Sequence, residues 1–548
     1  MKNKRKFFLN ALLLTAVALF MRTVGVTFQV YLAGRAGAEA MGLLSLIGGV
    51  YGFAVTLATS GIHLATVRTV AQSEEKNGGA GTGQCLRACL FYALFFGTLA
   101  TALLFLLAPV LGHYALRDAR TVRALRMMSV TLLPIALTSV LNGYFIAVRR
   151  AYKNALAQVA EQALKITLTV FLLSFFLPQS VEGNVFVILL GGAVSESFSL
   201  LLNLILYRTD RKKHKSATNL RGGKVGVAAI AMPVAISAYA RSGLISIEHI
   251  LIKMGLMRHG SGNAEALSAY GALHGMALPV VLYPSAILSS FASLLIPEVT
   301  AEEARSNRRE ISYITGRVYQ MSLLFAIGVS GIMLFLSREL GQTLYKDASV
   351  GIYICHLAPL IPVMYLDTAT DAMLKGLGQQ VYSMNVNIID ALLSVISVFI
   401  LVPRIGISGY LVTIYLTETV NAALSISWLL KISGYRPRLF RLFVCPLLSA
   451  IGATAFAKLI IELLLRPFSQ TAGGVWLHIP LTAILYLLFL YLTGTFGREE
   501  TRWLFHAIGK ETALKENEKR CDSPSARKED RPGQNSEASH SGNIFASS

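Results

Sequence analysis

The stretch that decides the fold is AQVAEQALKITLTVFLLSFFLP at residues 157–178, which is mostly apolar after its first turn. A helix needs about 20 such residues to cross a hydrocarbon core of roughly 30 Å. Similar runs recur along the chain, so we expect an all-α integral membrane protein with about fourteen transmembrane helices. The expected helices are 7–33, 41–71, 85–111, 124–148, 155–177, 185–207, 225–255, 266–296, 312–336, 351–375, 381–402, 407–431, 441–465 and 475–496.

Composition supports this interpretation. The chain is 54% hydrophobic with a mean hydropathy of +0.56, and its charged fraction of 15% lies below the roughly 25% of soluble domains. The net charge of +20 does not indicate nucleic-acid binding, because the basic residues form short clusters between apolar runs. The first apolar run continues to Tyr31, too long for a cleaved signal sequence, so we expect an uncleaved first helix.

The basic clusters also predict the orientation of the helices. With the N-terminus in the cytoplasm, alternate loops such as 208–224 are rich in Lys and Arg, as the positive-inside rule requires. Loops on the other side hold fewer basic residues, and we assign Lys253 to one of them. The exception is a stretch with four arginines, Arg117, Arg120, Arg123 and Arg126. We therefore expect a multi-pass plasma-membrane protein with both termini in the cytoplasm.

Polar residues inside the apolar runs indicate an internal duplication. Asn142, Gln158 and Glu161 precede Asp371, Asn387 and Asp390 at one constant offset, because 371−142, 387−158 and 390−161 are all equal. Two further pairs, Arg22 with Arg241 and Glu196 with Glu418, fit with modest gaps. The paired segments are six helices apart, so both copies have the same orientation. Chance agreement in an apolar sequence is the alternative.

The duplication predicts two parallel six-helix lobes around a central cavity, which can rock against each other and open the cavity to either side in turn. We place the lobes at 1–220 and 221–435, two additional transmembrane helices at 436–497, and a disordered cytoplasmic tail at 498–548 because that tail is polar. This is the architecture of a transporter.

Charged and polar side chains inside the runs are the candidate site. A charge near the centre of a spanning helix costs about 2.5–3.5 kcal/mol, so it usually faces a bundle interior or a watery cavity. The substrate-binding candidates are Arg22, Arg241, Asn142, Asp367 and Asp371, and the candidates for ion coupling or structural pairing are Glu161, Glu248, Asp390, Glu196 and Glu418. Asp367 and Asp371 lie one helical turn apart, so they share a face that should line the cavity. The alternative is that such charges form structural ion pairs.

Enzyme motifs are absent from the sequence. It contains no Walker loop, HExxH, GxSxG or CxxC pair, and its cysteines lack metal-ligand spacing. We therefore expect a protein that is not an enzyme and that uses no cofactor or metal. Transport would depend on an ion gradient, the membrane potential or downhill movement.

Five short motifs resemble one family. They are Leu141-Asn-Gly-Tyr-Phe-Ile-Ala-Val, Ala157-Gln-Val-Ala-Glu-Gln, Leu295-Ile-Pro-Glu, Lys375-Gly-Leu-Gly-Gln and Val402-Pro-Arg-Ile-Gly-Ile-Ser-Gly. Each is loose, but their order and spacing resemble the oligosaccharide flippases of the MOP superfamily, of the stage V sporulation protein B type, which are related to MurJ-type lipid II flippases. The resemblance covers roughly residues 5–497. It implies a fourteen-helix, two-lobed fold that moves lipid-linked sugars across the cytoplasmic membrane.

The resemblance also implies roles for single residues. The head of a polyprenyl-pyrophosphate sugar is anionic, and Arg22 resembles the first-helix arginine of MurJ-type proteins, so it is the expected head-group ligand. Glu248 lies where sporulation-type relatives often carry an acid. The sequence departs from the MurJ pattern at Phe28 and His274, near positions that carry arginine in those proteins, and this counts against lipid II as the substrate.

Three functions stay open at this point. The favoured one is a flippase for a peptidoglycan precursor or another cell-wall or spore-wall unit, a monomer with the lipid-linked glycan, membrane lipids and cell-wall synthesis enzymes as partners. The alternative is a cation-coupled multidrug or small-molecule exporter of the MATE type, which usually has twelve helices; the two additional helices favour the flippase. A membrane scaffold with purely structural charges is the third, and the proline-interrupted helices and cavity-facing acids argue against it.

Overall fold

The computed structural model describes residues 2–77, 82–176, 180–213, 226–437, 440–464 and 472–497. The chain divides into two compact units, Met1–Phe489 and Leu490–Ser548, and the first contains nearly all of the described helical residues. Within the described residues every regular element is a helix and no strand is present, so the all-α prediction is confirmed. The expected disordered tail, 498–548, lies outside the described residues.

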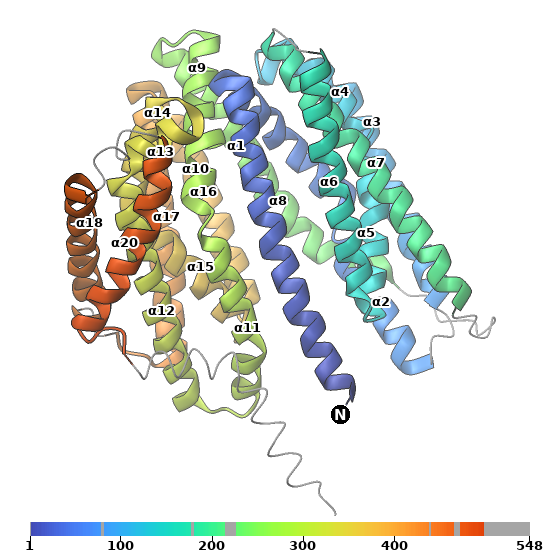
Figure 1. Ribbon diagram of the computed structural model, residues 1–548. Coiled ribbons are helices and arrows are strands. Elements are labelled where there is room, and N and C mark those ends of the chain that lie inside the picture. The colour runs from blue at the N-terminus through green and yellow to red at the C-terminus, as the bar shows by residue number, and fades with distance from the viewer. Residues whose placement is uncertain are drawn as a thin grey trace, which may run out of the picture. The chain divides into compact units, whose positions relative to one another are not determined.

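The helices follow one another with short connections (Figure 1). Those before residue 220 are α1 (Lys2–Thr59), α2 (Ile62–Asn77), α3 (Thr82–Val110), the π-helix η1 (Leu111–Ala115), α4 (Arg120–Ser129), α5 (Leu132–Ala147), α6 (Ala151–Phe176) and α7 (Val181–Lys213). Those up to residue 435 are α8 (Val227–His259), α9 (Asn263–Tyr270), the π-helix η2 (Gly271–Ala277), α10 (Leu278–Leu282), α11 (Ser285–Ala304), α12 (Arg308–Phe335), α13 (Ser337–Tyr345), α14 (Ala348–Leu357), the 3-10 helix η3 (Ala358–Leu360), α15 (Ile361–Gly376), α16 (Gln380–Ile405) and α17 (Ile407–Ser433). The π-helix η4 (Phe440–Val444), α18 (Cys445–Leu464) and α20 (Ala472–Leu492) follow.

The number of membrane spans can be compared with the expected fourteen. Within the described residues, 11 helical runs are long and apolar enough to cross a membrane, or 12 if Asn263–Leu282 and Ser285–Ala292, bent by 49°, form one broken span. Leu19–Glu74 counts once although α1 turns at the non-helical Gly37 (φ 83°, ψ 171°), and α17 is not among the counted runs. The protein is therefore a multi-pass membrane protein, and the number fourteen stays a prediction.

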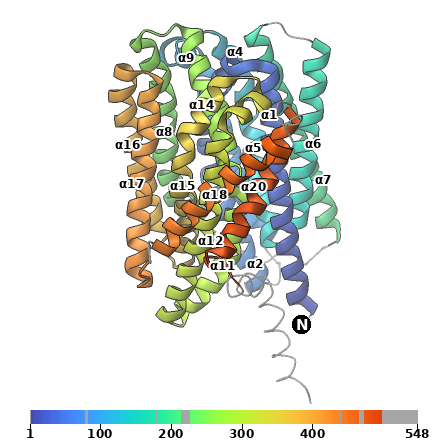
Figure 2. The same cartoon turned by 60° about the vertical axis from the view of Figure 1, so that its left-hand side comes forward.

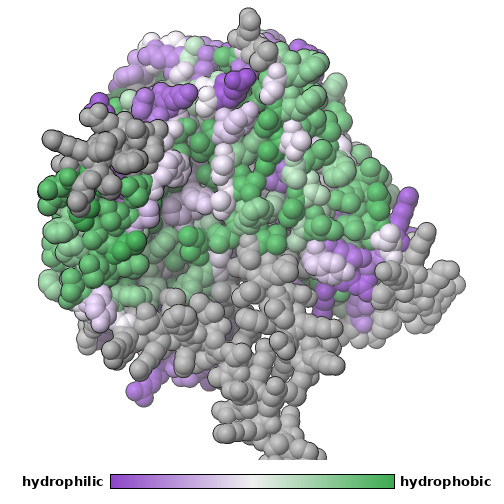
Figure 3. All heavy atoms as spheres, in the orientation of Figure 1, coloured by the Kyte–Doolittle hydropathy of each residue, from purple (hydrophilic) through white to green (hydrophobic). Residues whose placement is uncertain are grey.

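The surface agrees with a membrane environment. Figure 3 shows apolar residues across the middle of one face, while hydrophilic residues gather toward its upper and lower edges. Many large apolar side chains are exposed, for example Phe91, Phe175 and Leu463 at 73%, 70% and 73%. Lipid tails can cover such side chains, whereas water would not.

Backbone landmarks support the duplication. Residues with left-handed φ recur at matching positions: Lys346 follows Arg117, and Gly378 follows Arg149, at the same offset as the polar pairs. Gly260 follows Gly37 at a slightly shorter offset, and the first residues of α2 and α11, Ile62 and Ser285, share that shorter offset. Non-glycine residues rarely adopt this conformation, so its recurrence at fixed spacing is informative. The proposed lobe limits, 1–220 and 221–435, stay a prediction; we call these segments the first half and the second half.

Each half packs mainly within itself. In the first half α3 packs on α5 and α6 on α7, and in the second α16 packs on α8 and α17 while α11 and α12 pack on α15. The two additional helices lie against the second half, because α18 packs on α12, and Tyr486 of α20 donates a hydrogen bond to the Leu324 carbonyl of α12 (2.8 Å). Figure 2 shows α18 and α20 in front of the helices of this half.

Candidate functional site

The two halves meet along α1, beyond its turn at Gly37, and α8. Ser246 Oγ of α8 donates a hydrogen bond to the Gly49 carbonyl (2.7 Å), and one turn away Thr56 Oγ1 donates to Ser242 Oγ (3.1 Å). These bonds join segments almost two hundred positions apart in the sequence. Helices α1 and α8 are therefore the seam between the halves.

The closest approach lies where α1 meets α9 and η2. A methyl group on Gly42 would lie 2.0 Å from the Leu267 carbonyl oxygen, and one on Gly271 would lie 2.0 Å from the Ala38 carbonyl oxygen. Only glycine allows the backbones to come this near. We call this region the Gly37 end; Figure 1 shows it opposite the N-terminus, with α4 and α9 nearby.

Arg22 lies on α1, and its side chain is exposed. Its charge acts on the hydroxyl of Tyr365 in α15, and the neighbouring Thr23 accepts a hydrogen bond from the Tyr283 hydroxyl (3.1 Å). Among the described residues no carboxylate lies within ion-pair distance of Arg22. The guanidinium thus lies close enough to α15 for its charge to act there, and no carboxylate of the described residues pairs with it.

Four predicted carboxylates gather in the second half: Glu248 of α8, Asp367 of α15, Asp390 of α16 and Glu418 of α17. Asp390 acts electrostatically on both Glu248 and Glu418, and Glu418 is also influenced by Asp367. Arg241 of α8 is exposed and near enough to act on Asp390. No described Lys or Arg lies within 4.0 Å of the four, so they are not neutralised by structural ion pairs within the described chain.

Asp367 and Asp371, expected to share a cavity face, differ in their partners. Asp367 Oδ2 accepts a hydrogen bond from Asn421 Nδ2 (3.0 Å), whereas Asp367 Oδ1 and Asn421 Oδ1 are buried with no hydrogen-bond partner. Asp371 forms an ion pair with Lys375 on its own helix (2.5 Å) and accepts a hydrogen bond from Ser383. Asp367 therefore keeps a free acceptor, and Asp371 is neutralised locally.

The remaining predicted residues lie in the first half. Asn142 of α5 has a buried amide oxygen without a partner. Glu161 of α6 and Glu196 of α7 influence each other, and Lys165 is the cation that acts on Glu196. The structure therefore brings predicted residues together in two places, in the acidic group of the second half with Arg241, and at Glu161 with Glu196. Arg22 and Asn142 lie apart from these groups.

A group of two half-buried histidines and two buried tyrosines is only partly anticipated by the sequence. His249 Nδ1 is hydrogen-bonded to the Tyr270 hydroxyl, His274 Nδ1 to the Tyr410 hydroxyl (3.0 Å), and the two imidazole rings lie 4.8 Å apart, edge to face. The sequence singles out His274 but neither tyrosine. Tyr270 and Tyr410 are apolar enough to be assigned to helix packing, and nothing local in the sequence connects them with a histidine.

The π-helix η2, which contains His274, forms further contacts through its carbonyl groups. A π turn leaves carbonyls outside the regular helical bonding. Gln29 Nε2 of α1 donates to the Gly275 carbonyl (3.1 Å), and Tyr345 donates to the Met276 carbonyl (3.1 Å). One of these bonds crosses between the halves.

The assignment of Lys253 to a loop is wrong. Helix α8 continues to His259, and the Lys253 side chain is 1% exposed. It stays buried because its ammonium donates to the Leu116 carbonyl (2.6 Å) and lies 3.7 Å from Asp118 Oδ2. Both acceptors lie far from Lys253 in the sequence, so no local pattern could have indicated them.

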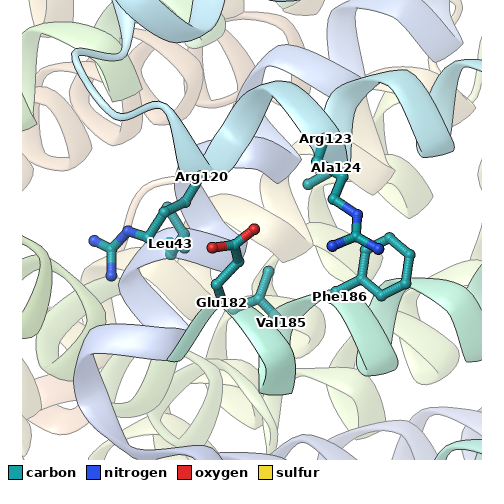
Figure 4. Close-up of a pocket in the computed structure, with 7 residues that line it drawn as sticks. All are labelled: Leu43, Arg120, Arg123, Ala124, Glu182, Val185 and Phe186. Carbon is teal, nitrogen blue, oxygen red and sulfur yellow. The ribbon is translucent and has the colours of Figure 1, made fainter. Parts of the chain in front are cut away.

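A small pocket lies near this region, lined by Leu43, Arg120, Arg123, Ala124, Glu182, Val185 and Phe186. Figure 4 shows Glu182 between Arg120 and Arg123, with Arg123 over the Phe186 ring at 4.3 Å from its centre. It includes none of the ten predicted site residues. The two arginines belong to the basic stretch that does not fit the orientation pattern.

Comparisons with known proteins agree with this geometry. The family model described as "Polysaccharide biosynthesis protein" matches residues 8–297. The chain is 26% identical to stage V sporulation protein B of Bacillus subtilis (strain 168) over 465 residues, 82% of this chain and 89% of that protein. Its fold is similar to the lipid II flippase MurJ in an inward closed conformation (TM-score 0.66, 13% identity, 88% and 98% of the two chains). It is also similar to an inward-facing MATE multidrug resistance transporter of the MOP superfamily (TM-score 0.60, 14% identity, 77% and 98%).

Proposed function

The chain belongs to the polysaccharide biosynthesis protein family, and from this premise we propose that it is a flippase for a polyprenyl-pyrophosphate-linked sugar. The cargo would be a peptidoglycan precursor or another cell-wall or spore-wall polysaccharide unit, moved across the cytoplasmic membrane by alternating access. Proteins of this family and fold are transporters and flippases rather than enzymes. The observation that carries the proposal is Arg22 of α1, whose charge acts on Tyr365 of the second half and which pairs with no carboxylate of the described residues.

A pyrophosphate head needs cations when it leaves water. Arginine is suited to this task because its planar guanidinium donates two parallel hydrogen bonds to a phosphate. Arg22 is exposed, carries no described counter-ion, and lies near enough to the second half for its charge to act on Tyr365, so we place the head group beside it. Arg241 would supply a second cation from α8. The lipid tail would stay in the bilayer.

The carboxylates have a separate role in this proposal. Glu248, Asp390 and Glu418 would form the core of a site for a coupling cation or proton, because none of them has an ion-pair partner among the described residues, although the charge of Arg241 acts on Asp390. Asp367 adds a free oxygen to the same group. Asn142 and Asp371 would contact the sugar from matching helices of the two halves, and the pair Glu161 and Glu196 would couple or stabilise the first half.

One observation favours the alternative of a cation-coupled exporter of the MATE type. The second half is rich in unpaired carboxylates, which would suit a cationic substrate as well as a coupling ion. We prefer the flippase because α18 and α20 add two helices beyond the duplicated unit. In either case we propose a monomer in the plasma membrane, with both termini in the cytoplasm, and cell-wall synthesis enzymes as partners of the flippase.

Reconstitution into vesicles tests the proposal. A fluorescent lipid-linked oligosaccharide is added, and its protection from an external modifying reagent is measured over time. Wild type should exchange the lipid between leaflets, and Arg22→Ala should slow exchange about tenfold to a hundredfold, as expected for loss of a charged hydrogen bond. Arg241→Ala should have a smaller effect in the same direction.

Arg404→Ala is the matched control, because Arg404 is an exposed arginine at the end of α16 outside the site. Its exchange rate should equal that of wild type. Equal rates for wild type, Arg22→Ala and empty vesicles would rule out the flippase. Extrusion of a cationic dye driven by a proton or sodium gradient, without exchange of the lipid, would favour the exporter.

A further inference from the structure

A buried ion network begins in the first half at the Gly37 end. Asp118 lies between η1 and α4, and its side chain is 3% exposed. Arg120 donates to both of its oxygens, from Nε to Oδ1 (3.0 Å) and from Nη2 to Oδ2 (2.8 Å). Through Nη1 the same guanidinium reaches Glu39 Oε1 on α1 (2.9 Å). These three residues hold the η1–α4 connection against α1.

The second half completes the network from two different helices. Lys253 of α8 places its ammonium 3.7 Å from Asp118 Oδ2 and donates to the Leu116 carbonyl (2.6 Å), while its side chain is 1% exposed. Asn263, the first residue of α9, donates from Nδ2 to Asp118 Oδ2 (3.1 Å). Asp118 is thus bound by both halves at once. We call Glu39, Asp118, Arg120, Lys253 and Asn263 the Asp118 network.

The network is not required by the local fold. Asp347 is the counterpart of Asp118 at the offset of the duplication, and it follows Lys346 in the same left-handed conformation as Arg117. Among the described residues, Asp347 accepts hydrogen bonds only from the backbone and hydroxyl of Ser349, in the next helix of its own half. A cap of this kind is enough to start the helix. The bonds from Lys253 and Asn263 to Asp118 are additional, and they connect the halves.

The burial of these charges makes separation an all-or-none event. An ammonium and a carboxylate that are shielded from water are stable only while they are paired and hydrogen-bonded. Moving α8 and α9 away from α4 would therefore leave Lys253 and Asp118 without partners until water enters between the halves. Intermediate separations are unfavourable, so the network favours either a closed or a fully hydrated state.

We propose that the Asp118 network is the gate that holds the Gly37 end closed, and that its opening is an obligatory step of transport. This rests on the alternating access of the proposed function. With the N-terminus in the cytoplasm, the Gly37 end is extracellular, and the described conformation is closed on that side. Gly42 and Gly271, which let the backbones approach beside the network, extend the same closed surface.

The gate is tested by the distance between the halves, without any substrate. The five native cysteines are replaced, and spin labels are attached at His113→Cys in η1 and Ala264→Cys in α9, two positions beside the network. Double electron–electron resonance on the full chain in lipid nanodiscs gives the populations of short and long distances. Wild type should show mainly the short distance.

Asp118→Asn and Lys253→Met should each raise the ratio of long to short distances about tenfold, because each removes one charged hydrogen-bond partner while retaining most of the side-chain shape. Asn263→Ala removes no charge and should shift the ratio in the same direction by less. It keeps the test decisive if a charge variant fails to fold. Asp347→Asn, the matched control in the other half, should leave the ratio unchanged.

Unchanged ratios in Asp118→Asn, Lys253→Met and Asn263→Ala, or an equal change in Asp347→Asn, would overturn the gate. The outcome is separate from the vesicle experiment. A protein whose distances respond as expected but which exchanges no lipid-linked sugar keeps the gate and loses the flippase. A protein that exchanges the lipid-linked sugar but whose spin-label distances do not respond to the substitutions keeps the flippase and loses the gate.

Discussion

Asp118 and Asp347 occupy the same position in the two halves and have the same local structure, yet their surroundings differ. Each accepts a hydrogen bond from the backbone N–H two residues later, at 3.1 Å from Arg120 and 2.8 Å from Ser349. Asp118 is bound in addition by Arg120 and by residues of the other half, whereas Asp347 is half-buried and bonded only locally. The backbone is alike at the two positions, and the side chains around it differ.

The difference teaches where to look for asymmetry in a duplicated protein. A cap needs only its own helix, so it is retained in both copies for reasons of local stability. Contacts across the halves need partners such as Lys253 and Asn263, which have no equivalent use at Asp347. The acidic group differs only in part, because Glu161 and Glu196 are the first-half counterparts of Asp390 and Glu418 and also influence each other. Glu248 and Asp367 are the acids that the second half adds. Function is expected where the two copies differ.

The largest expected effect is on stability. Asp118→Ala leaves Lys253 buried without a carboxylate, so it should lower the free energy of unfolding by about 3–5 kcal/mol, the cost of breaking a buried pair. Asp347→Ala removes only a helix cap and should cost about 1 kcal/mol. Unfolding by increasing SDS in mixed micelles, followed by circular dichroism, measures both. Similar losses would mean that the contacts between the halves add nothing to Asp118.

A smaller effect is expected at the glycine contact. Gly271→Ala places a methyl group 2.0 Å from the Ala38 carbonyl oxygen, which should destabilise the closed state by about 1–3 kcal/mol. Gly48 is its counterpart at the offset that relates Gly37 to Gly260, and it has nothing within 4 Å of an added methyl. Gly48→Ala should be neutral or stabilising by up to about 1 kcal/mol, because alanine favours helices.

The readout is again the spin-label distance together with the SDS midpoint. Gly271→Ala should lower the SDS midpoint of unfolding and increase the population at the long distance. Gly48→Ala should change neither quantity in this direction. A tolerated Gly271→Ala would show that α1 and η2 do not need to approach so closely for the gate to close.

The smallest expected effect is that of moderate acid. Burial alone would raise the pKa of Asp118, but hydrogen bonds from Arg120 and Asn263 and the charge of Lys253 outweigh it, so its pKa lies below the usual value. A carboxylate with a lowered pKa stabilises the folded state above its unfolded pKa and loses this contribution as the pH falls through the folded pKa. The groups around it are Arg120 of α4, which also contacts Glu39 of α1, Lys253 of α8 and Asn263 of α9.

The ratio of long to short distances should therefore stay constant between about pH 7.5 and 5. It should rise only when the pH falls below about 3.9, the usual pKa of an aspartate carboxyl. The same titration of Asp118→Asn should lack the acid step. Opening of wild type around pH 6 would contradict the role of Asp118 as a strongly bound carboxylate.

The sequence predicts the fold well because its signals are local. Apolar runs define the helices, and polar residues at constant spacing, such as Asn142 and Asp371, indicate the duplication. Local pairing is also readable: Lys375 lies four residues after Asp371, a spacing typical of helical ion pairs, although we assign Asp371 to a cavity from the sequence. The number of spans is harder to predict, because the turn at Gly37 depends on packing and because α17, which carries Glu418 and Asn421, is not among the counted runs.

The contacts between the halves could not be read from the sequence. Lys253 near the end of an expected helix indicates a loop, and only the fold brings Leu116 and Asp118 to it. The π-helix η2 could not be read from local sequence patterns either. The same is true of the tyrosine partners of His249 and His274. Such features depend on residues distant in the sequence or on packing, so their discovery needs the structure.

The separation of the Asp118 network along the chain has a consequence for biosynthesis. Asp118 and Asn263 lie 145 residues apart, which takes a ribosome roughly 7 to 30 s at typical rates. During this interval the nascent chain already contains Arg120 and Glu39, the first-half members of the network. It does not yet contain Lys253 or Asn263. The Gly37 end is therefore completed late, after the first half has been synthesised, and a chain stopped before α8 would lack the two bonds that join the halves at Asp118.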